Sequence, residues 1–239
     1  MATKNLIVDN KNFDISYEII NPTRTKDIIF LHGWGSNKDI MKNVFSAYLK
    51  NFRHIYIDLP GFGKTANKYE LKTKDYAKIT DEFLKLLNSS KEVIVGHSYG
   101  GKVATLINPK NLVLLSSAGI LEEKPFDVKL KIVIAKIFNK LGLSNITKSF
   151  RSKDVNTMSE SMYATFKNVV NEDFSSHFSS FQNNALIFWG EKDVATSLDS
   201  GKKIASLIKK STFISYDGDH YFFAQNAKDI SERIENGIL

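Results

Sequence analysis

The chain has 239 residues, 42% of them hydrophobic, and a formal net charge of +7, and this length fits one α/β domain with a sizeable core. It contains no cysteine, which excludes disulfides, thiolate metal sites and a cysteine nucleophile and agrees with a cytoplasmic location. Its apolar runs are too short for a signal peptide or for the ~18 residues of a membrane span, and no nucleic-acid motif accompanies the basic charge, so we expect neither integral membrane association nor a nucleic-acid partner.

Short β-branched runs alternate with helical patterns along the chain. Residues 6–8 and 13–19 flank an Asn-Lys-Asn turn and predict a hairpin. Further strands are expected at 27–31, 54–58, 93–95, 112–115, 185–189 and 213–216, and helices at 38–50, 75–88, 198–210 and 222–237. This alternation, with near-continuous apolar strands, predicts an α/β fold with a mostly parallel eight-stranded sheet and helices on both faces.

About seventy residues, from 116 to 185, interrupt this rhythm with no strand signal. Apolar residues at 130, 133, 134, 137, 138 and 141 are spaced for one helix face, and Lys129, Lys136 and Lys140 fall on the other face. We therefore predict a helical lid at 121–181 inserted into a core domain formed by 1–120 and 182–239. An ordinary second small core is the plainer interpretation, and the two are compatible.

The sequence GHSYGG (residues 96–101) stands where an apolar strand ends. A serine hydroxyl reacts only when a base removes its proton and when the side chain is reachable. A sharp strand-to-helix turn lifts the side chain clear, and it requires small residues two positions before and after the serine. Gly96 and Gly100 meet this rule, so Ser98 is the candidate nucleophile.

A base is expected on a loop after the last strand, and His220 follows the strand at 213–216. An acid that orients the imidazole is expected at another strand end, where Asp193 follows the strand at 185–189. Glu191, Asp217 and Asp219 are competing acids, and the last two are so near His220 in sequence that they more simply shape its turn.

The reaction also needs two backbone N–H groups directed at the oxygen that gains charge. One is expected from Tyr99, directly after Ser98. The other is expected from the loop that follows the strand at 27–31, which reads His-Gly-Trp-Gly (residues 32–35), because glycine lets the backbone approach closely. The alternative for this loop is a plain turn.

Taken together, these motifs make the chain similar to the α/β-hydrolase fold family over nearly its whole length. The matching segments are LHGWG (31–35), DLPGFGKT (58–65), GHSYGG (96–101), LSSAG (115–119), GEKD (190–193) and GDH (218–220). The resemblance is to the carboxylesterase-like and meta-cleavage-product-hydrolase-like branch. It implies that Ser98, Asp193 and His220 are the catalytic residues and that the Trp34 and Tyr99 amides form the oxyanion hole, with no metal and no cofactor.

One departure from the family pattern concerns the helix after the nucleophile. Only about ten residues separate Gly101 from the next strand, and Pro109 ends the helix early. The first turn, which presents the serine, is retained, so we expect altered packing behind an intact elbow.

The expected function is a serine hydrolase that cleaves small carboxylic esters through an acyl-enzyme. The alternatives are a C–C bond hydrolase of the meta-cleavage type, a carrier-protein methyl ester esterase, a haloperoxidase side activity and a non-enzymatic hydrolase-fold binding protein. Candidate substrate contacts come from the oxyanion loop and the lid: His32, Gly33, Val133, Ile137, Phe138, Met162 and Phe166. Residues 121–153 carry eight basic and three acidic residues, so this basic lid could dock an acyl carrier protein, with plain solvation as the simpler interpretation.

Overall fold

The computed structural model describes residues 1–121 and 158–238. Its strands are β1 (Ala2–Val8), β2 (Lys11–Ile20), β3 (Asp27–Leu31), β4 (Arg53–Ile57), β5 (Val93–His97), β6 (Asn111–Leu115), β7 (Asn184–Gly190) and β8 (Ser211–Tyr216). They form one sheet in the order β1-β2-β4-β3-β5-β6-β7-β8. The β1–β2 hairpin and the β2–β4 pair are antiparallel, and the other pairs are parallel. The predicted mostly parallel eight-stranded sheet is confirmed.

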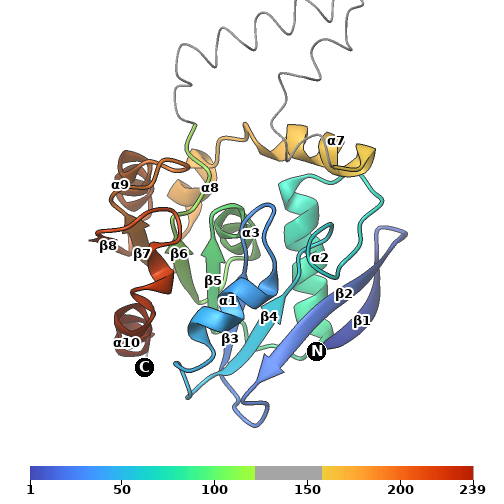
Figure 1. Cartoon of the computed structure of the whole chain (residues 1–239), viewed down its shortest axis with the longest axis horizontal. Coiled ribbons are helices and arrows are strands. Elements are labelled where there is room, and N and C mark those ends of the chain that lie inside the picture. The colour runs from blue at the N-terminus through green and yellow to red at the C-terminus, as the bar shows by residue number, and fades with distance from the viewer. Residues whose placement is uncertain (122–157, 239) are drawn as a thin grey trace, which may run out of the picture.

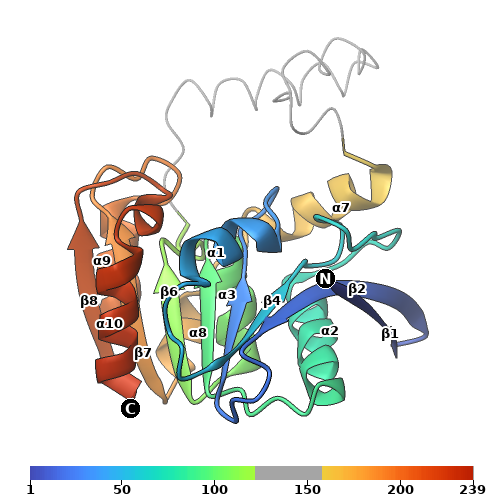
Figure 2. The same ribbon diagram turned by 60° about the horizontal axis from the view of Figure 1, so that its bottom comes forward.

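Helices cover both faces of this sheet (Figures 1 and 2). They are α1 (Lys38–Phe45), α2 (Thr73–Leu86), α3 (Tyr99–Ile107), α7 (Glu160–Val169), α8 (Ser175–Ser180), α9 (Leu198–Leu207) and α10 (Ala227–Ile238), with a 3₁₀ turn, η2 (Phe222–Ala224). Alternate residues of β3 serve different layers. Ile28 and Phe30 join the core under α1 and α10, whereas Ile29 and Leu31 join the core under α2, α3 and α9. A strand buried on both faces has no polar side, which explains its continuous apolar sequence.

Two helix predictions need correction. The helix expected at 38–50 ends at Phe45, and Leu49 then takes a left-handed backbone conformation, φ 54°, which no helix continues. The helix expected at 222–237 is divided into η2 and α10. At this break, the Asn226 side-chain amide donates to the Phe222 carbonyl at 2.7 Å, in place of the backbone amide that would do so in a continuous helix.

The helix that follows Ser98 is as short as the sequence predicts. It ends at Ile107, and the capping residue Asn108 is left-handed, with φ 56°. Pro109 comes next and cannot continue a helix because its nitrogen carries no hydrogen.

The described part of the predicted lid is helical and lies beyond the carboxyl ends of the parallel strands, where α7 spans the edge of the sheet (Figure 1). Its Thr165 hydroxyl accepts a hydrogen bond from the Leu71 amide at 3.0 Å, and the Phe174 amide donates to the Gly119 carbonyl at 2.8 Å. The lid boundaries at 121 and 181 stay a prediction, and the amphipathic helix expected at 130–141 lies outside the described residues. Among the residues that are described, no helix is long and apolar enough to cross a membrane.

A buried ion pair fixes the start of α1 against the loop that follows β4. The Lys38 ammonium lies 2.7 Å from Asp58 Oδ2, with side chains 1% and 0% exposed. The Lys38 and Lys64 amides also donate to this carboxylate. Burial alone raises the pKa of Asp58, but these hydrogen bonds and the lysine charge outweigh burial and lower it. Removing one partner would leave an uncompensated charge in the core.

Replacing Lys38 with methionine therefore tests the buried pair. We expect Lys38→Met to lower the free energy of unfolding, measured by urea unfolding, by about 3–5 kcal/mol. Lys42→Met is the matched control on the same helix, since Lys42 pairs with Glu18 at 30% and 22% exposure and should change stability by less than about 1 kcal/mol. Equal losses in the two variants would contradict the role given to burial.

Candidate active site

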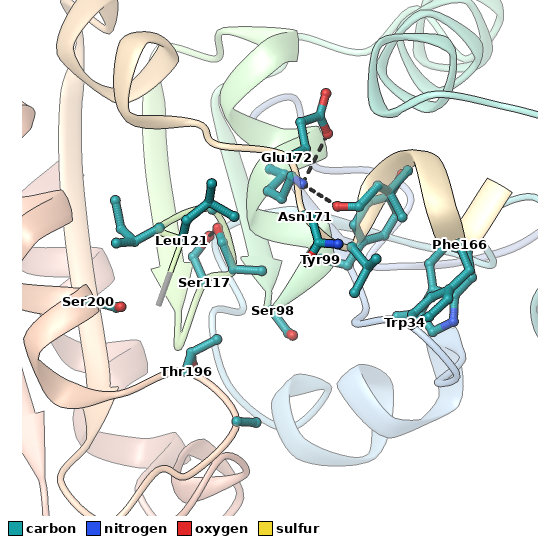
Figure 3. Close-up of a pocket in the computed structure, with 17 residues that line it drawn as sticks. Trp34, Ser98, Tyr99, Ser117, Leu121, Phe166, Asn171, Glu172, Thr196 and Ser200 are labelled. Atoms are coloured by element: carbon teal, nitrogen blue, oxygen red, sulfur yellow. Dashed lines mark hydrogen bonds and ion pairs between the residues drawn. The ribbon is translucent and has the colours of Figure 1, made fainter. Parts of the chain in front are cut away.

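The predicted nucleophile Ser98 sits at the junction between β5 and α3, half-buried, with a backbone conformation of φ 52° and ψ −116°. This region is unfavourable for a residue with a side chain, at a cost of about 1–3 kcal/mol. Neighbouring backbone groups hold it in place. The Ser98 amide donates to the Leu115 carbonyl, and its carbonyl accepts from Gly101 and Ala118. Figure 3 shows the Ser98 hydroxyl directed into a cavity.

Two glycines make this turn possible. A Cβ atom on Gly96 would lie 2.5 Å from the Gly100 carbonyl oxygen, and one on Gly100 would lie 2.7 Å from the His32 carbonyl oxygen. Both obstacles are backbone atoms, which cannot move aside as a flexible side chain can. The spacing of glycines around Ser98 therefore has a steric cause.

Asp193 and His220, which are 27 residues apart, meet beyond the ends of β7 and β8. His220 Nδ1 lies 2.7 Å from Asp193 Oδ2. The Asp193 carboxylate also accepts from the amides of Ala195 and Thr196 and from the Thr196 hydroxyl. Burial by itself raises the pKa of Asp193, but the hydrogen bonds from His220 and Thr196 lower it to about 2. The carboxylate is thus ionised at neutral pH and can only accept, which places the hydrogen on Nδ1 and the lone pair on Nε2 of a neutral ring.

The three competing acids have other partners. Glu191 accepts from the Ser215 hydroxyl at 2.7 Å, and Asp217 pairs with Lys192. Asp219 accepts from the Tyr221 amide at 2.8 Å, inside the turn that carries His220. Among the side-chain contacts of the described residues, Asp193 is the carboxylate that bonds the His220 ring.

A second histidine ties the His220 loop to the serine turn. His97, directly before Ser98, is buried, and its Nε2 donates to the His220 carbonyl at 3.0 Å. The centroids of the His97 and His220 rings are 4.6 Å apart. Burial and the nearby His220 lower the pKa of His97 to about 3, so it stays neutral. No side-chain hydrogen bond links Ser98 to His220 in the described part of the chain, and such bonds commonly tighten only when substrate binds.

The loop after β3 is fixed by His32. The Leu59 amide donates to His32 Nε2 at 3.1 Å, so the ring hydrogen is on Nδ1, which lies 2.8 Å from the Gly33 carbonyl oxygen. Burial lowers the pKa of His32 to about 4 and keeps this neutral form. Because a trans peptide points its C=O and the next N–H in opposite directions, holding the Gly33 carbonyl also fixes the direction of the Trp34 N–H.

The backbone of Tyr99 supplies a second candidate donor. Tyr99 is the first residue of α3, where N–H groups have no partner within the helix and the helix dipole favours negative charge. The Trp34 and Tyr99 rings lie edge to face, 5.4 Å apart, which keeps the two segments together.

A cavity of about 350 Å³ opens at Ser98 and is large enough for a small ligand. In Figure 3, Trp34 and Phe166 lie to one side of Ser98, Leu121, Thr196 and Ser200 lie to the other, and Asn171 and Glu172 close the cavity above it. Apolar side chains dominate the walls, with a few polar groups among them.

The other predicted substrate contacts are distributed differently. Phe166 lines the Ser98 cavity, whereas Met162 lines a neighbouring cavity on the far side of Trp34. His32 and Gly33 lie in the loop after β3, but neither is among the residues that line the cavity. Val133, Ile137 and Phe138 lie outside the described residues, as does most of the basic segment at 121–153.

Sequence reasoning gave no role to Lys102 or Glu172. Lys102 is buried on α3 and forms an ion pair with Glu172 at 3.0 Å, and both line the cavity. The sequence did contain one indication of a buried lysine: Lys102 comes four residues after Ser98, on a short helix whose other residues are apolar or small.

Comparisons with known proteins agree with this architecture. The family model described as alpha/beta hydrolase fold matches residues 27–111. A pimeloyl-[acyl-carrier protein] methyl ester esterase of Wigglesworthia glossinidia brevipalpis is 28% identical over 204 residues, 80% of this chain and 70% of that protein. A 2-hydroxy-6-oxo-6-(2'-aminophenyl)hexa-2,4-dienoic acid hydrolase of Metapseudomonas resinovorans is 31% identical over 156 residues, 58% of this chain and 52% of that protein.

Solved structures show the same fold. An esterase from Exiguobacterium antarcticum superposes with a TM-score of 0.76 at 19% identity, covering 100% of this chain and 99% of that one. The strand order, the glycine-flanked turn at Ser98 and these matches show that the chain has the α/β-hydrolase fold.

Proposed function

We propose that the chain is a serine hydrolase that cleaves small carboxylic esters through an acyl-enzyme. The observation that carries this proposal is the 2.7 Å contact between Asp193 and His220. The backbone carbonyl of His220 also accepts a hydrogen bond from His97, the neighbour of Ser98. The strained turn at Ser98 and the cavity in front of it support the same function, as do the esterase relatives.

In the proposed reaction, His220 Nε2 takes the proton of the Ser98 hydroxyl as its oxygen attacks the ester carbonyl. The carbonyl oxygen becomes an oxyanion and accepts hydrogen bonds from the Trp34 and Tyr99 amides. The C–O bond then breaks, and the alcohol leaves with the proton held by His220. Water repeats the sequence on the acyl-enzyme and releases the carboxylic acid. Asp193 stabilises the charged imidazole and maintains its tautomer.

The relative from Metapseudomonas resinovorans keeps a second candidate function open. Its name describes a hydrolase of a dienoic acid, and C–C bond cleavage of that kind would use the same three residues. Turnover of a vinylogous diketone acid with no turnover of simple esters would favour this function over ester hydrolysis. The carrier-protein methyl ester esterase is a narrower form of the main proposal, supported by the relative from Wigglesworthia.

Ser98→Ala tests the nucleophile. We expect it to lower turnover of p-nitrophenyl butyrate by more than about 10⁴-fold, because no other group replaces the hydroxyl. A fluorophosphonate probe should modify the wild-type chain at Ser98, located by mass spectrometry of its peptides, and should leave Ser98→Ala unmodified. The control is Ser176→Ala, an exposed serine on α8, with wild-type turnover and labelling. A wild-type chain that is neither labelled nor active would favour a binding protein, and a fully active Ser98→Ala would exclude the mechanism.

His32→Phe tests the oxyanion loop. Losing a whole oxyanion donor costs about 10²–10³ in kcat, so misdirecting the Trp34 amide should lower kcat at least about tenfold with little change in KM. The matched control is His54→Phe, which removes another fully buried histidine with two hydrogen bonds, to Tyr56 and Leu49, at the opposite end of the strands. His54→Phe should lower the midpoint of thermal unfolding about as much as His32→Phe does, while leaving kcat unchanged. If both variants lost the same amount of kcat, the effect of His32 would be a general loss of stability and not a specific effect on the Trp34 amide.

A further inference from the structure

The proposed mechanism uses no charge on α3, yet this helix carries a buried cation close to Ser98. Lys102 is four residues beyond Ser98, one helical turn or about 6 Å along the axis. Its ammonium donates to the Val169 carbonyl at 2.8 Å and lies 4.7 Å from the centre of the Phe174 ring. Lysine is rarely buried without a partner, and the partner here is Glu172, at 3.0 Å.

The two members of this ion pair are unequally buried. The side chain of Lys102 is 2% exposed and that of Glu172 is 33% exposed. Glu172 belongs to the α7–α8 connector (residues 170–174), whose Val170 and Asn171 also line the cavity. The Thr73 hydroxyl and Lys102 both donate to the same Glu172 oxygen, Oε2. Both side chains line the cavity, but the ammonium is almost fully buried and the carboxylate is the more exposed member of the pair.

We propose that Glu172 is a specificity-determining residue that rejects acyl chains ending in a carboxylate, so that the site accepts esters of uncharged acyl chains. The inference rests on the proposed ester hydrolysis. A five-carbon acyl chain attached at Ser98 is about as long as the one helical turn that separates Ser98 from Lys102 along α3, so its far end can reach the Lys102–Glu172 pair. Two carboxylates a few ångströms apart repel each other, and at a partly buried site the repulsion is stronger than in bulk water. The Lys102 ammonium already interacts with the Glu172 carboxylate and donates to the Val169 carbonyl, so it offers little compensating attraction to a second carboxylate.

The alternative is that the ion pair only fastens the α7–α8 connector to α3. Both interpretations predict a loss of stability when the pair is broken. They differ in substrate selection, because a purely structural pair would affect charged and uncharged esters of equal length in the same proportion.

Two esters of equal length separate these interpretations. Methyl pentanoate ends in a methyl group and monomethyl glutarate ends in a carboxylate, and release of acid from each is followed by titration. We expect the wild-type chain to favour methyl pentanoate by at least about tenfold in kcat/KM, within the range that a pocket contact provides. Glu172→Gln should reduce this preference at least about tenfold, chiefly through KM. Glu160→Gln removes an exposed carboxylate from the start of α7 and should keep the wild-type preference.

Breaking an ion pair can unfold a protein, so a second variant is needed to separate a loss of folding from a change in substrate preference. Lys102→Met combined with Glu172→Gln removes both charges and leaves no unpaired ammonium in the core. It should also lose the preference for the uncharged ester. An unchanged ratio in the single and double variants, or a wild-type chain that cleaves both esters equally well, would overturn the proposal.

A binding measurement distinguishes this proposal from the proposed function. In the Ser98→Ala background, each ester is titrated and the fluorescence of Trp34, which lines the cavity, is followed. Methyl pentanoate should bind at least about tenfold more tightly than monomethyl glutarate, and Glu172→Gln should remove the difference. If the wild-type chain cleaves neither ester while this binding selectivity is present, ester hydrolysis fails and the role of Glu172 stands. Equal binding of the two esters overturns the role of Glu172 whatever the turnover.

Discussion

The site depends on a close backbone contact between the first turn of α3 and the ends of β3 and β5. Gly100 lies against the backbone of residues 31 and 32, and Gly96 lies against Gly100, with no room for a Cβ at either position. This contact holds Ser98 in its strained conformation of positive φ and brings the Tyr99 amide beside the loop that carries the Trp34 amide. One steric constraint therefore positions the proposed nucleophile and both proposed oxyanion donors relative to one another.

Charge is distributed around this turn so that each buried group has a fixed protonation state. Asp193 is held ionised by its hydrogen bonds, with a pKa of about 2. His32 and His97 are held neutral by burial, with pKa values of about 4 and about 3. Both histidines act through backbone carbonyls, those of Gly33 and His220. Neutral rings suit this task, because a charged imidazole buried next to His220 would raise the energy of the imidazolium that the proposed reaction forms.

The sequence predicted those features that depend on local pattern. The strands, their mostly parallel direction and the short helix after Ser98 follow from apolar runs, turn residues and Pro109. The Asp193–His220 contact could be anticipated because parallel strands end at one edge of the sheet, so loops far apart in sequence meet there. Helix ends were less predictable. One side-chain hydrogen bond from Asn226 to Phe222 marks the break before α10. The spacing of apolar residues around Asn226 does not indicate that the helix is interrupted there.

The Lys102–Glu172 pair was beyond prediction for a different reason. It joins α3 to a connector 70 residues later, and no strand register relates the two segments. The proposed reacting groups lie at strand ends, whose relative positions follow from the hydrogen-bonded ladder of the sheet. The cavity walls belong to α7 and the α7–α8 connector, which are attached to the core by separate contacts: Thr165 with Leu71, Glu172 with Lys102 and Thr73, and Phe174 with Gly119. Because the walls and the reacting groups are held by different interactions, residues of the wall can change what the cavity admits without moving the groups that react. On the proposed function, substrate preference therefore depends on the contacts of α7 and the connector, and the reaction type depends on the residues at the edge of the sheet.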